Sequence, residues 1–466
     1  MNTLLSFALA AATAWLSLDS SDKTKDIDRH IAIEPSQRIE INGFSGSNIT
    51  FTSWDKNEVY VKVQLRIESS DRDYEKEWTE SVKLTEKQSA GTLIVTLEEP
   101  DQHTSGGRGF WSRLFGSNYI RKQIEGEIFV PRSNALKANI PYATVSLEDM
   151  KGELRFRGQS NTLTLRNCAN ILDVDNDYGK TTIENSGGEL KLDSKSGTVM
   201  ISDFKGSIDA DVNYSKTSIS RVSKRVSLKS QSATLRFEDI QGDLFVAADY
   251  SNITASNIVG FADLSTKSGS VRVKQVKGVN VDALYSTVEI SGVSGESKKE
   301  IIVKGQSGKL IVEDAVGDLR IDNPYSTMEL RKIRGNVNLE TKSGRVTGED
   351  IAGNWNSRTE YSSITLKNLS AQQVLATNSS NPIDIEMKTV PSKIEIKNDY
   401  ASVKVTIPQG FSGDVALEAT YGNVESDLPI RVKSLGGGGY GAGKIGGGNG
   451  SISIETKSGN IRLYQR

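Results

Sequence analysis

The stretch "DYGKTTIENSGGELKLDSKSGTVMISDFKGSIDADVNYSKTSIS", residues 177–220, decides the fold because it repeats one pattern three times. Tyr178, Ser196 and Tyr214 follow one another at intervals of 18 residues (196 − 178 and 214 − 196), and alternating apolar and polar residues follow each of them. Alternation with a period of two is typical of a β-strand that has one buried face. The stretch therefore predicts a structural unit of about 18 residues that is built from short strands.

The same alternation of tyrosine and serine runs through most of the chain. The tyrosines are Tyr142, Tyr178, Tyr214, Tyr250, Tyr285, Tyr325, Tyr361 and Tyr400, and the serines between them are Ser160, Ser196, Ser232, Ser268, Ser307, Ser343 and Ser379. Each unit carries one apolar pair three and five residues after this position and a second pair twelve and fourteen residues after it, which predicts two strands joined by two turns. Equal units that stack on one another form a parallel β-solenoid with about 4.8 Å per coil. Parallel crossovers are nearly always right-handed, so we expect a right-handed coil.

Two further columns describe the turns. Ten residues after the tyrosine or serine, most units carry glycine, as at Gly152, Gly188 and Gly206, and such a position is typical of backbone with positive φ. Eight residues after it, most units carry an apolar residue, and Cys168 belongs to this column. Cys168 is therefore predicted to be a small buried hydrophobic residue and not a reactive thiol.

The tyrosine and serine positions themselves are predicted to be a structural turn column that keeps the coils in register. Its clearest members are Tyr178, Ser196, Tyr214, Ser232, Tyr250 and Ser268. We expect each ring to lie over the small serine of the next coil. The residues directly before them place Asp177 beside Lys195 and Asp249 beside Lys267, which predicts exposed ion pairs worth about 0.2–1 kcal/mol each.

Composition excludes several classes of function. The chain has 57 basic and 59 acidic residues, a balance that gives no electrostatic footprint for nucleic acid. It has two histidines, His30 and His103, and one cysteine, which leaves neither an internal disulfide nor a cysteine-based zinc site. No catalytic constellation has suitable spacing, so we expect no enzymatic activity, no metal and no cofactor.

The first residues resemble an export signal. Leu4 to Ala12 form a short apolar core, and Ala12-Thr13-Ala14 fits a cleavage site of small residues. We expect residues 1–14 to be a signal peptide and residues 15–30 to be a flexible segment. No other apolar run approaches the roughly 20 residues that span a bilayer, so no transmembrane segment is predicted. The protein is expected in the periplasm or at the cell surface of a bacterium.

Residues 31–140 are rich in predicted strands but do not keep the 18-residue step, and we expect an entry region that caps the solenoid. Within it, "RDYEKEWTESVKL" (72–84) fits either a short helix or an edge strand. A glycine-rich loop spans residues 101–119 and carries four aromatic residues. Residues 141–466 are predicted to be the solenoid, with a glycine-rich insertion at 434–451 that fits either a flexible loop or a flap over the last coil.

Several stretches carry a resemblance to a known family. They are "NGFSGSNITFTSWDKNEVYVKVQ" (42–64), "IFVPRSNALKANIPYATVSLEDMKGEL" (128–154) and the recurring "KSGTVMI", "KSGSVRV", "KSGRVTG" and "KSGNIRL". With these, the chain resembles the bacterial "putative adhesin" β-strand-repeat family, a domain of unknown function related to head-GIN adhesin-like domains. The resemblance implies an exported, non-enzymatic β-solenoid and implies little about a ligand.

The sequence favours a structural or adhesin-like interaction module whose partner is a surface glycan or a protein. Phe110, Trp111, Phe115 and Tyr119 of the aromatic loop form the candidate interaction patch. Two alternatives stay open. One is a glycan-active enzyme built on a β-helix. The other is a scaffold that associates end to end through its C-terminal coil, because "SISIETKSGNIRLYQR" (451–466) would leave the last coil uncovered.

Overall fold

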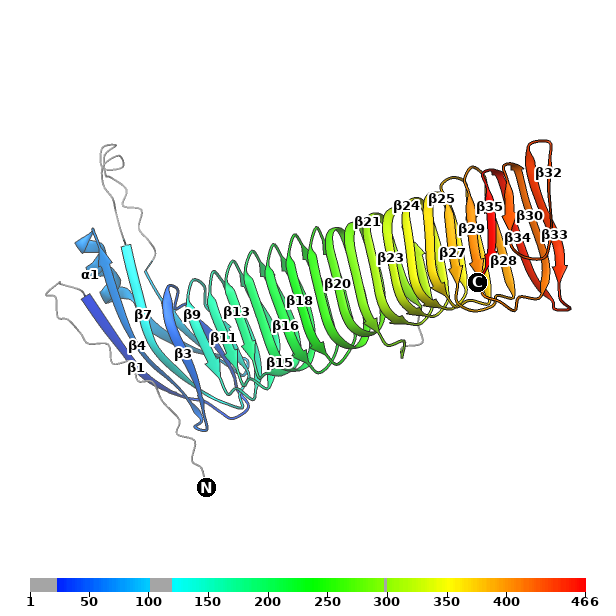
Figure 1. Ribbon diagram of the computed structural model, residues 1–466. Coiled ribbons are helices and arrows are strands. Elements are labelled where there is room, and N and C mark those ends of the chain that lie inside the picture. Colours follow the sequence, from blue (N-terminus) through cyan, green and yellow to red (C-terminus); the bar gives the residue numbers. More distant parts are fainter. Residues whose placement is uncertain (1–22, 101–119, 297–299) are drawn as a thin grey trace, which may run out of the picture.

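The computed structural model describes residues 23–100, 120–296 and 300–466. It is a long rod of stacked strands with a broader cap at its N-terminal end (Figure 1). Successive coils pair in parallel at the predicted step, as in Thr162 with Lys180 and Lys180 with Thr198. The predicted all-β parallel solenoid of two-strand coils is confirmed.

Two columns of strands build the rod. One column begins with β9 (Thr144–Glu148), β11 (Thr162–Arg166) and β13 (Lys180–Glu184), and the other contains β10 (Glu153–Gln159) and β12 (Asn170–Asp177). The strands that continue the rod are β14 (Gly187–Lys195), β15 (Thr198–Asn213), β16 (Lys216–Val222), β17 (Val226–Gln231), β18 (Thr234–Ile240), β19 (Leu244–Asp249), β20 (Asn252–Val293), β21 (Ile301–Val316), β22 (Leu319–Asp322), β23 (Tyr325–Arg334), β24 (Val337–Ala352), β25 (Trp355–Leu369), β26 (Gln373–Asn378) and β27 (Ile383–Met387). Alternate side chains of both columns point inward and form one continuous core, including Val145, Leu147, Leu163, Leu165, Ile183, Val199 and Ile201.

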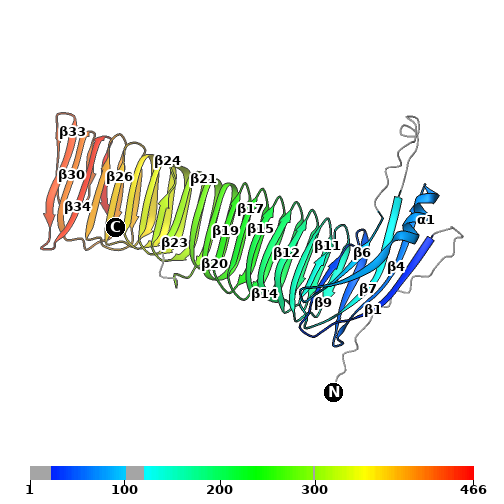
Figure 2. The ribbon, with the colours of Figure 1, turned by 180° about the vertical axis from the view of Figure 1, so that it is seen from behind.

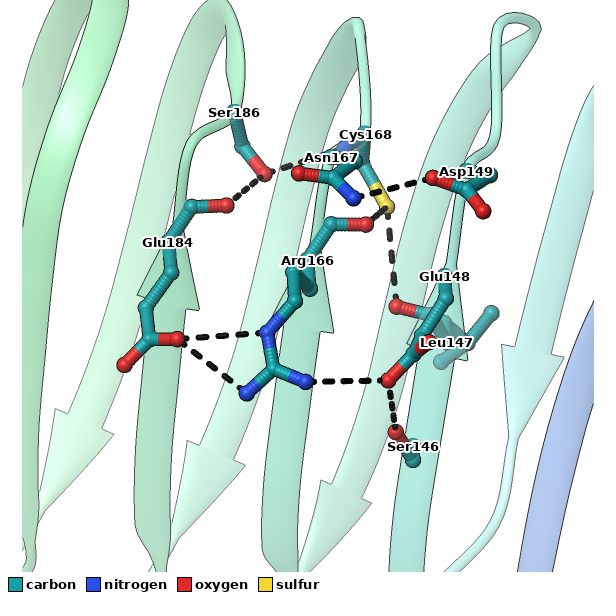
Figure 3. Close-up of polar contacts among 9 residues, drawn as sticks. All are labelled: Ser146, Leu147, Glu148, Asp149, Arg166, Asn167, Cys168, Glu184 and Ser186. Atoms are coloured by element: carbon teal, nitrogen blue, oxygen red, sulfur yellow. Dashed lines mark hydrogen bonds and ion pairs between the residues drawn. The ribbon is translucent and has the colours of Figure 1, made fainter. Parts of the chain in front are cut away.

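Polar contacts between coils hold the outer faces in register. Arg166 of β11 lies between two acidic residues of the adjacent coils, at 3.2 Å from Glu148 and 3.2 Å from Glu184 (Figure 3). In the turn that follows, Asn167 donates a hydrogen bond to Asp149 at 2.9 Å. Opposite charges and amide pairs at directly neighbouring positions stabilise one register over another, whereas like charges there would be destabilising.

The N-terminal cap extends one column of strands in antiparallel fashion. β1 (Lys23–Ala32) pairs with β4 (Glu58–Ser69), and β4 pairs with β7 (Ile120–Pro131). The expectation of a flexible segment over residues 15–30 is therefore wrong from Lys23 onward, because the backbone of β1 joins the sheet and Ile27 packs against the core. In the other column the cap adds β5 (Lys83–Ser89) and β6 (Thr92–Glu98).

The stretch that fitted a helix or an edge strand forms helix α1 (Arg72–Ser81). Asp71 caps its N-terminus by accepting hydrogen bonds from the backbone N–H groups of Asp73 and Tyr74. Trp78 is fully buried beneath the helix, and its indole N–H donates to Glu99 at 3.2 Å. The helix thus places an aromatic side chain in the core of the cap.

Coil stacking begins inside the region that was predicted to be an entry domain. β2 (Arg38–Asn42) pairs in parallel with β8 (Leu136–Asn139), and β3 (Ser47–Trp54) pairs in parallel with β9. Residues 38–54 therefore form a two-strand coil on which the later coils stack. The predicted boundary at residue 141 is not a break in the sheet.

The C-terminal end departs from chain order. β28 (Lys393–Asn398) pairs with β34 (Gly450–Ser458), and β34 pairs with β30 (Gly413–Tyr421). The last coil of the chain is therefore inserted between two coils that precede it in sequence. The chain end accordingly lies inside the rod and not at its tip (Figures 1 and 2).

The other column repeats this insertion, because β29 (Val403–Ile407) and β31 (Val424–Ser426) both pair with β35 (Ile461–Gln465). A hairpin of β32 (Arg431–Leu435) and β33 (Gly438–Ile445) then covers β30 in antiparallel fashion. The glycine-rich insertion is thus an ordered strand of the end cap. The expectation of end-to-end association through an uncovered C-terminal coil is wrong, since that coil is paired on both sides.

Candidate functional site

A row of exposed tyrosines runs along one corner of the rod. Their side chains are 52% to 70% exposed, although most large apolar residues of the described chain are buried. We call this row the tyrosine ridge, and its members are Tyr142, Tyr178, Tyr214, Tyr250, Tyr285, Tyr325, Tyr361, Tyr400 and Tyr421. Repeated exposure of one aromatic residue type at equivalent positions marks this corner as the most distinctive surface of the rod.

Serine separates successive tyrosines in space. The registers of β20, β21, β23 and β24 place Ser307 between Tyr285 and Tyr325, and Ser343 between Tyr325 and Tyr361. Because coils are about 4.8 Å apart, the rings recur about every 9.6 Å. The ridge is therefore a regular one-dimensional array of rings with gaps between them.

The inserted C-terminal coil preserves this spacing. Tyr400 and Tyr421 follow one another in the chain on coils that are not adjacent in the rod. Ser458 of β34 lies between them, since it pairs with Tyr421 and its backbone N–H donates to Asp399 at 2.7 Å. Lys457 Nζ also lies 2.8 Å from Asp399. The alternation of tyrosine and serine is thus a property of the rod surface, and it holds even where the chain order is broken.

The backbone at the N-terminal part of the ridge is in the left-handed region. Tyr142, Tyr178, Tyr214 and Tyr250 have φ between 55° and 58°, and the serines among them have φ between 53° and 57°. Glycine or asparagine adopts this conformation readily, whereas other residues lose about 1–2 kcal/mol there. The chain therefore bears a cost at each of these tyrosines that a glycine would avoid.

Polar side chains flank the rings. The Tyr214 hydroxyl donates to Gln231 on the next coil at 3.3 Å, and Gln159 donates to the Tyr142 hydroxyl. These rings reach toward the residue before the next serine but leave more than half of their surface exposed. The structure places Tyr178, Ser196, Tyr214, Ser232 and Tyr250 between strands, whereas Ser268 lies within β20. The role of this column in keeping register stays a prediction.

The two predicted ion pairs beside the ridge are confirmed. Lys195 Nζ lies 3.4 Å from Asp177, and Lys267 is paired with Asp249 in the same way. The carboxylate of Asp177 raises the pKa of the Lys195 ammonium above its ordinary value. The ridge is therefore bordered by fixed charges of both signs, together with amide side chains.

The chemical groups that could react are few in the described residues. Residues 23–100, 120–296 and 300–466 contain no group of three or more His, Cys, Asp or Glu side chains that could hold a metal ion. Cys168 is fully buried, and its Sγ lies 3.4 Å from the carbonyl oxygen of Arg166 (Figure 3). Burial raises the pKa of the Cys168 thiol to about 11. The predicted absence of a metal and a cofactor stays a prediction.

A depression over β22, β24 and β25 contains charged side chains and bears on the enzyme alternative. Its charged lining residues are Glu300, Arg320, Asp322, Glu340 and Arg358. Arg358 lies 3.8 Å from Glu340, so this hollow holds cationic and anionic side chains together. The carboxylate of Glu340 is thus next to a cation, which favours its ionised form over the protonated form that a general acid needs.

The candidate patch of Phe110, Trp111, Phe115 and Tyr119 lies outside the described residues. In the described part of the cap, another aromatic row was missed by the sequence reasoning. His30 stacks on Tyr60 with a centroid distance of 4.0 Å, and Tyr60, Phe129 and Trp54 continue the row across three strands. Its members come from distant parts of the chain, so only strand pairing brings them together.

Within residues 23–100, 120–296 and 300–466, no helix has the length and apolar character that a membrane span requires. Residues 11–464 match the model of a family described as Toastrack DUF4097. No curated protein is significantly similar to the chain. One solved structure to which it is similar is a "putative cell adhesion protein from Clostridium sporogenes ATCC 15579", with 10% identity over 95% of this chain and 100% of that chain, and a TM-score of 0.13. At that TM-score, the likeness carries no weight for fold or function.

Proposed function

The chain belongs to the Toastrack DUF4097 family, and from the surface of its rod we propose that it is a non-enzymatic interaction module that binds its partner along the tyrosine ridge. The observation that carries this proposal is the ridge itself, in which nine exposed rings keep one spacing along the rod. Exposed aromatic residues are enriched at binding surfaces because they offer large contact areas at low entropic cost.

The strained backbone supports the same proposal. A turn that served only to connect two strands would be more stable with glycine or asparagine at the left-handed position. Backbone strain is found preferentially where side-chain placement is needed for function. Four tyrosines on left-handed backbone, with their rings turned to solvent, fit a surface that is selected for contact with a partner.

Export to the periplasm or cell surface is part of the proposal. It is supported by the apolar core from Leu4 to Ala12 and the small residues that follow it. A rigid rod with a binding edge suits an adhesin-like role at the bacterial envelope. Fractionation of cells that produce the tagged protein, with the tag found in the cytoplasmic fraction, would overturn this part of the proposal.

The binding proposal predicts that the triple variant Tyr178→Ser, Tyr214→Ser, Tyr250→Ser loses binding without losing stability. Serine occupies the same column with the same φ at Ser196 and Ser232, so the fold already accepts it there. Fluorescently labelled full-length protein is incubated with the envelope fraction of the producing bacterium, and the bound fraction is measured. Removal of three consecutive rings should lower binding by at least about tenfold, because contacts along one rod act together.

A matched control removes three exposed apolar side chains that are not on the ridge. Met200→Ser, Phe245→Ser and Val259→Ser change side chains that are 37% to 40% exposed. This control should bind like the unchanged protein. Equal binding by the ridge variant and the control variant would overturn the proposed function, and thermal unfolding of each variant shows whether the rod is intact.

A further inference from the structure

The geometry points to a ligand class for the ridge: we infer that it binds an extended β-1,4-linked polysaccharide, with one tyrosine ring for each disaccharide. This inference rests on the proposed function, because it names the ligand of the same surface. Four features support it, and they are the spacing of the rings, their alternation with serine, their polar borders and the length of the array.

The spacing of the rings corresponds to the disaccharide. Tyrosines on every second coil recur about every 9.6 Å along the rod. In a β-1,4-linked chain of pyranose sugars, each sugar is turned over relative to the one before it, so the chain repeats by disaccharides. Two extended sugars have nearly the same length as two coils. A straight glycan laid along the ridge would therefore meet each ring at an equivalent sugar.

The alternation of tyrosine with serine fits the alternation of the sugars. Every second sugar presents the same apolar C–H face to the ridge, and such a face packs on an aromatic ring. The sugar between two rings then lies over a serine, such as Ser196 between Tyr178 and Tyr214. A small hydroxyl side chain leaves room for that sugar and can exchange hydrogen bonds with it.

The borders of the ridge match the edges of such a sugar chain. The hydroxyl groups of β-linked glucose or N-acetylglucosamine point sideways from the ring plane. Gln159 and Gln231 already bond to ridge hydroxyls, and Asp177 and Lys195 lie directly beside the rings. Apolar rings with a few polar groups at their edges are typical of sites that bind amphipathic ligands.

The inserted C-terminal coil is the strongest evidence that the spacing itself is the important property. Tyr400 and Tyr421 would occupy adjacent coils if the chain stacked in sequence order, with their rings about 4.8 Å apart. Insertion of Ser458 between them restores the two-coil spacing. A small ligand or a compact protein surface would need only a few rings, whereas a regular array along the rod fits a regular polymer.

The test measures binding of defined oligosaccharides to the full-length protein by calorimetry. The probes are cellobiose, cellotetraose and cellohexaose, the corresponding chitin oligosaccharides, and maltohexaose, whose α-1,4 linkages curve the chain. A β-1,4-linked hexasaccharide spans three rings, so Kd should fall by about tenfold with each added disaccharide. Comparison of the glucose series with the N-acetylglucosamine series identifies which sugar the ridge binds.

The variant Tyr178→Ser, Tyr214→Ser, Tyr250→Ser removes the second to fourth of the nine rings and leaves Tyr285 to Tyr421 intact. The number of hexasaccharides bound per rod should therefore fall from about three to about one, while the Kd of the remaining site stays unchanged. The control variant Met200→Ser, Phe245→Ser, Val259→Ser should bind like the unchanged protein. Binding of maltohexaose as tight as that of cellohexaose and chitohexaose, or a Kd that is independent of length, would overturn the inference. If the ridge variant loses binding to the envelope fraction but neither β-1,4-linked series binds, the ligand class is wrong and the proposed function stands.

Discussion

At the scale of single residues, the turns use glycine for a second reason besides the one that the sequence indicated. Gly188 and Gly206 have positive φ, as predicted, but Gly152 is not in that region. A Cβ at Gly152 would lie 2.1 Å from the carbonyl oxygen of Asn134 on the preceding coil. The glycine column therefore permits close approach of the backbones, and left-handed φ near 55° occurs at the tyrosines and serines from Tyr142 to Tyr250 and at residues such as Asn167.

Gly152→Ala should accordingly destabilise the rod by about 1–3 kcal/mol, because backbone atoms of the neighbouring coil must move to admit the methyl group. Urea denaturation that is followed by circular dichroism measures the change. Gly447→Ala is the matched control, since a Cβ there meets nothing within 4 Å. An equal effect of the two substitutions would show that close approach at Gly152 is not limiting.

A second prediction at this scale concerns the reactivity of the Cys168 thiol, which is buried and has a pKa raised to about 11. The native protein should not react with dithiobisnitrobenzoate at about pH 8, whereas the denatured protein should release one equivalent of thiolate. An unfolded thiol ionises near its ordinary pKa of 9.0. The contribution of Cys168 to stability is therefore complete below that pH and is lost as the pH rises toward 11. Rapid labelling of the native protein would contradict this prediction.

At the scale of elements, the sequence predicted strand pairs and their inward columns well, because an 18-residue step with a period of two admits few other structures. The prediction failed where the pairing between neighbouring strands is irregular. The inward pair twelve and fourteen residues after Ser160 is predicted to be Leu172 and Val174, but a β-bulge lies in the pairing of β10 with β12, and Ile171 is buried in place of Leu172. One extra residue shifts which side chain faces the core, and the residue pattern alone does not reveal it.

The ridge shows a similar limit of sequence reasoning. The column of tyrosine and serine was found from its spacing, but exposure of the rings depends on which way each turn projects, and spacing does not determine that. Tyr421 and Ser458 were missed because their place in the column follows from coil order in space. The aromatic row of His30, Tyr60 and Phe129 was missed for the same reason, since three separate strands supply it.

At the scale of the whole molecule, the rod is closed at its C-terminal end by an order of assembly that differs from chain order. The coil of β30 and β31 and the hairpin of β32 and β33 come earlier in the chain than the coil that supports them. An open parallel edge would invite association with other chains. The hairpin covers that edge, and the inserted coil joins the cap to the rest of the rod.

The truncation 1–446 should therefore do more than shorten the rod, because it removes a coil from the interior of the stack. Ile452, Ile454, Ile461 and Leu463 are almost completely buried, and each contributes about 1.5–3 kcal/mol of hydrophobic burial. Without them, residues 413–445 lose their parallel partner and should be digested rapidly by protease, whereas the coils before residue 407 stay resistant.

Mass spectrometry of a limited digest identifies the boundary, and the truncation 1–409 is the control that lacks the cap altogether. Addition of the peptide 447–466 should restore the protease resistance of residues 413–445 in the truncation 1–446. The truncation 1–409 lacks those residues, so the peptide should have no such effect on it. If 1–446 resists protease as well as the full chain does, then the inserted coil does not hold the cap, and the gap closes by direct stacking of β30 on β28.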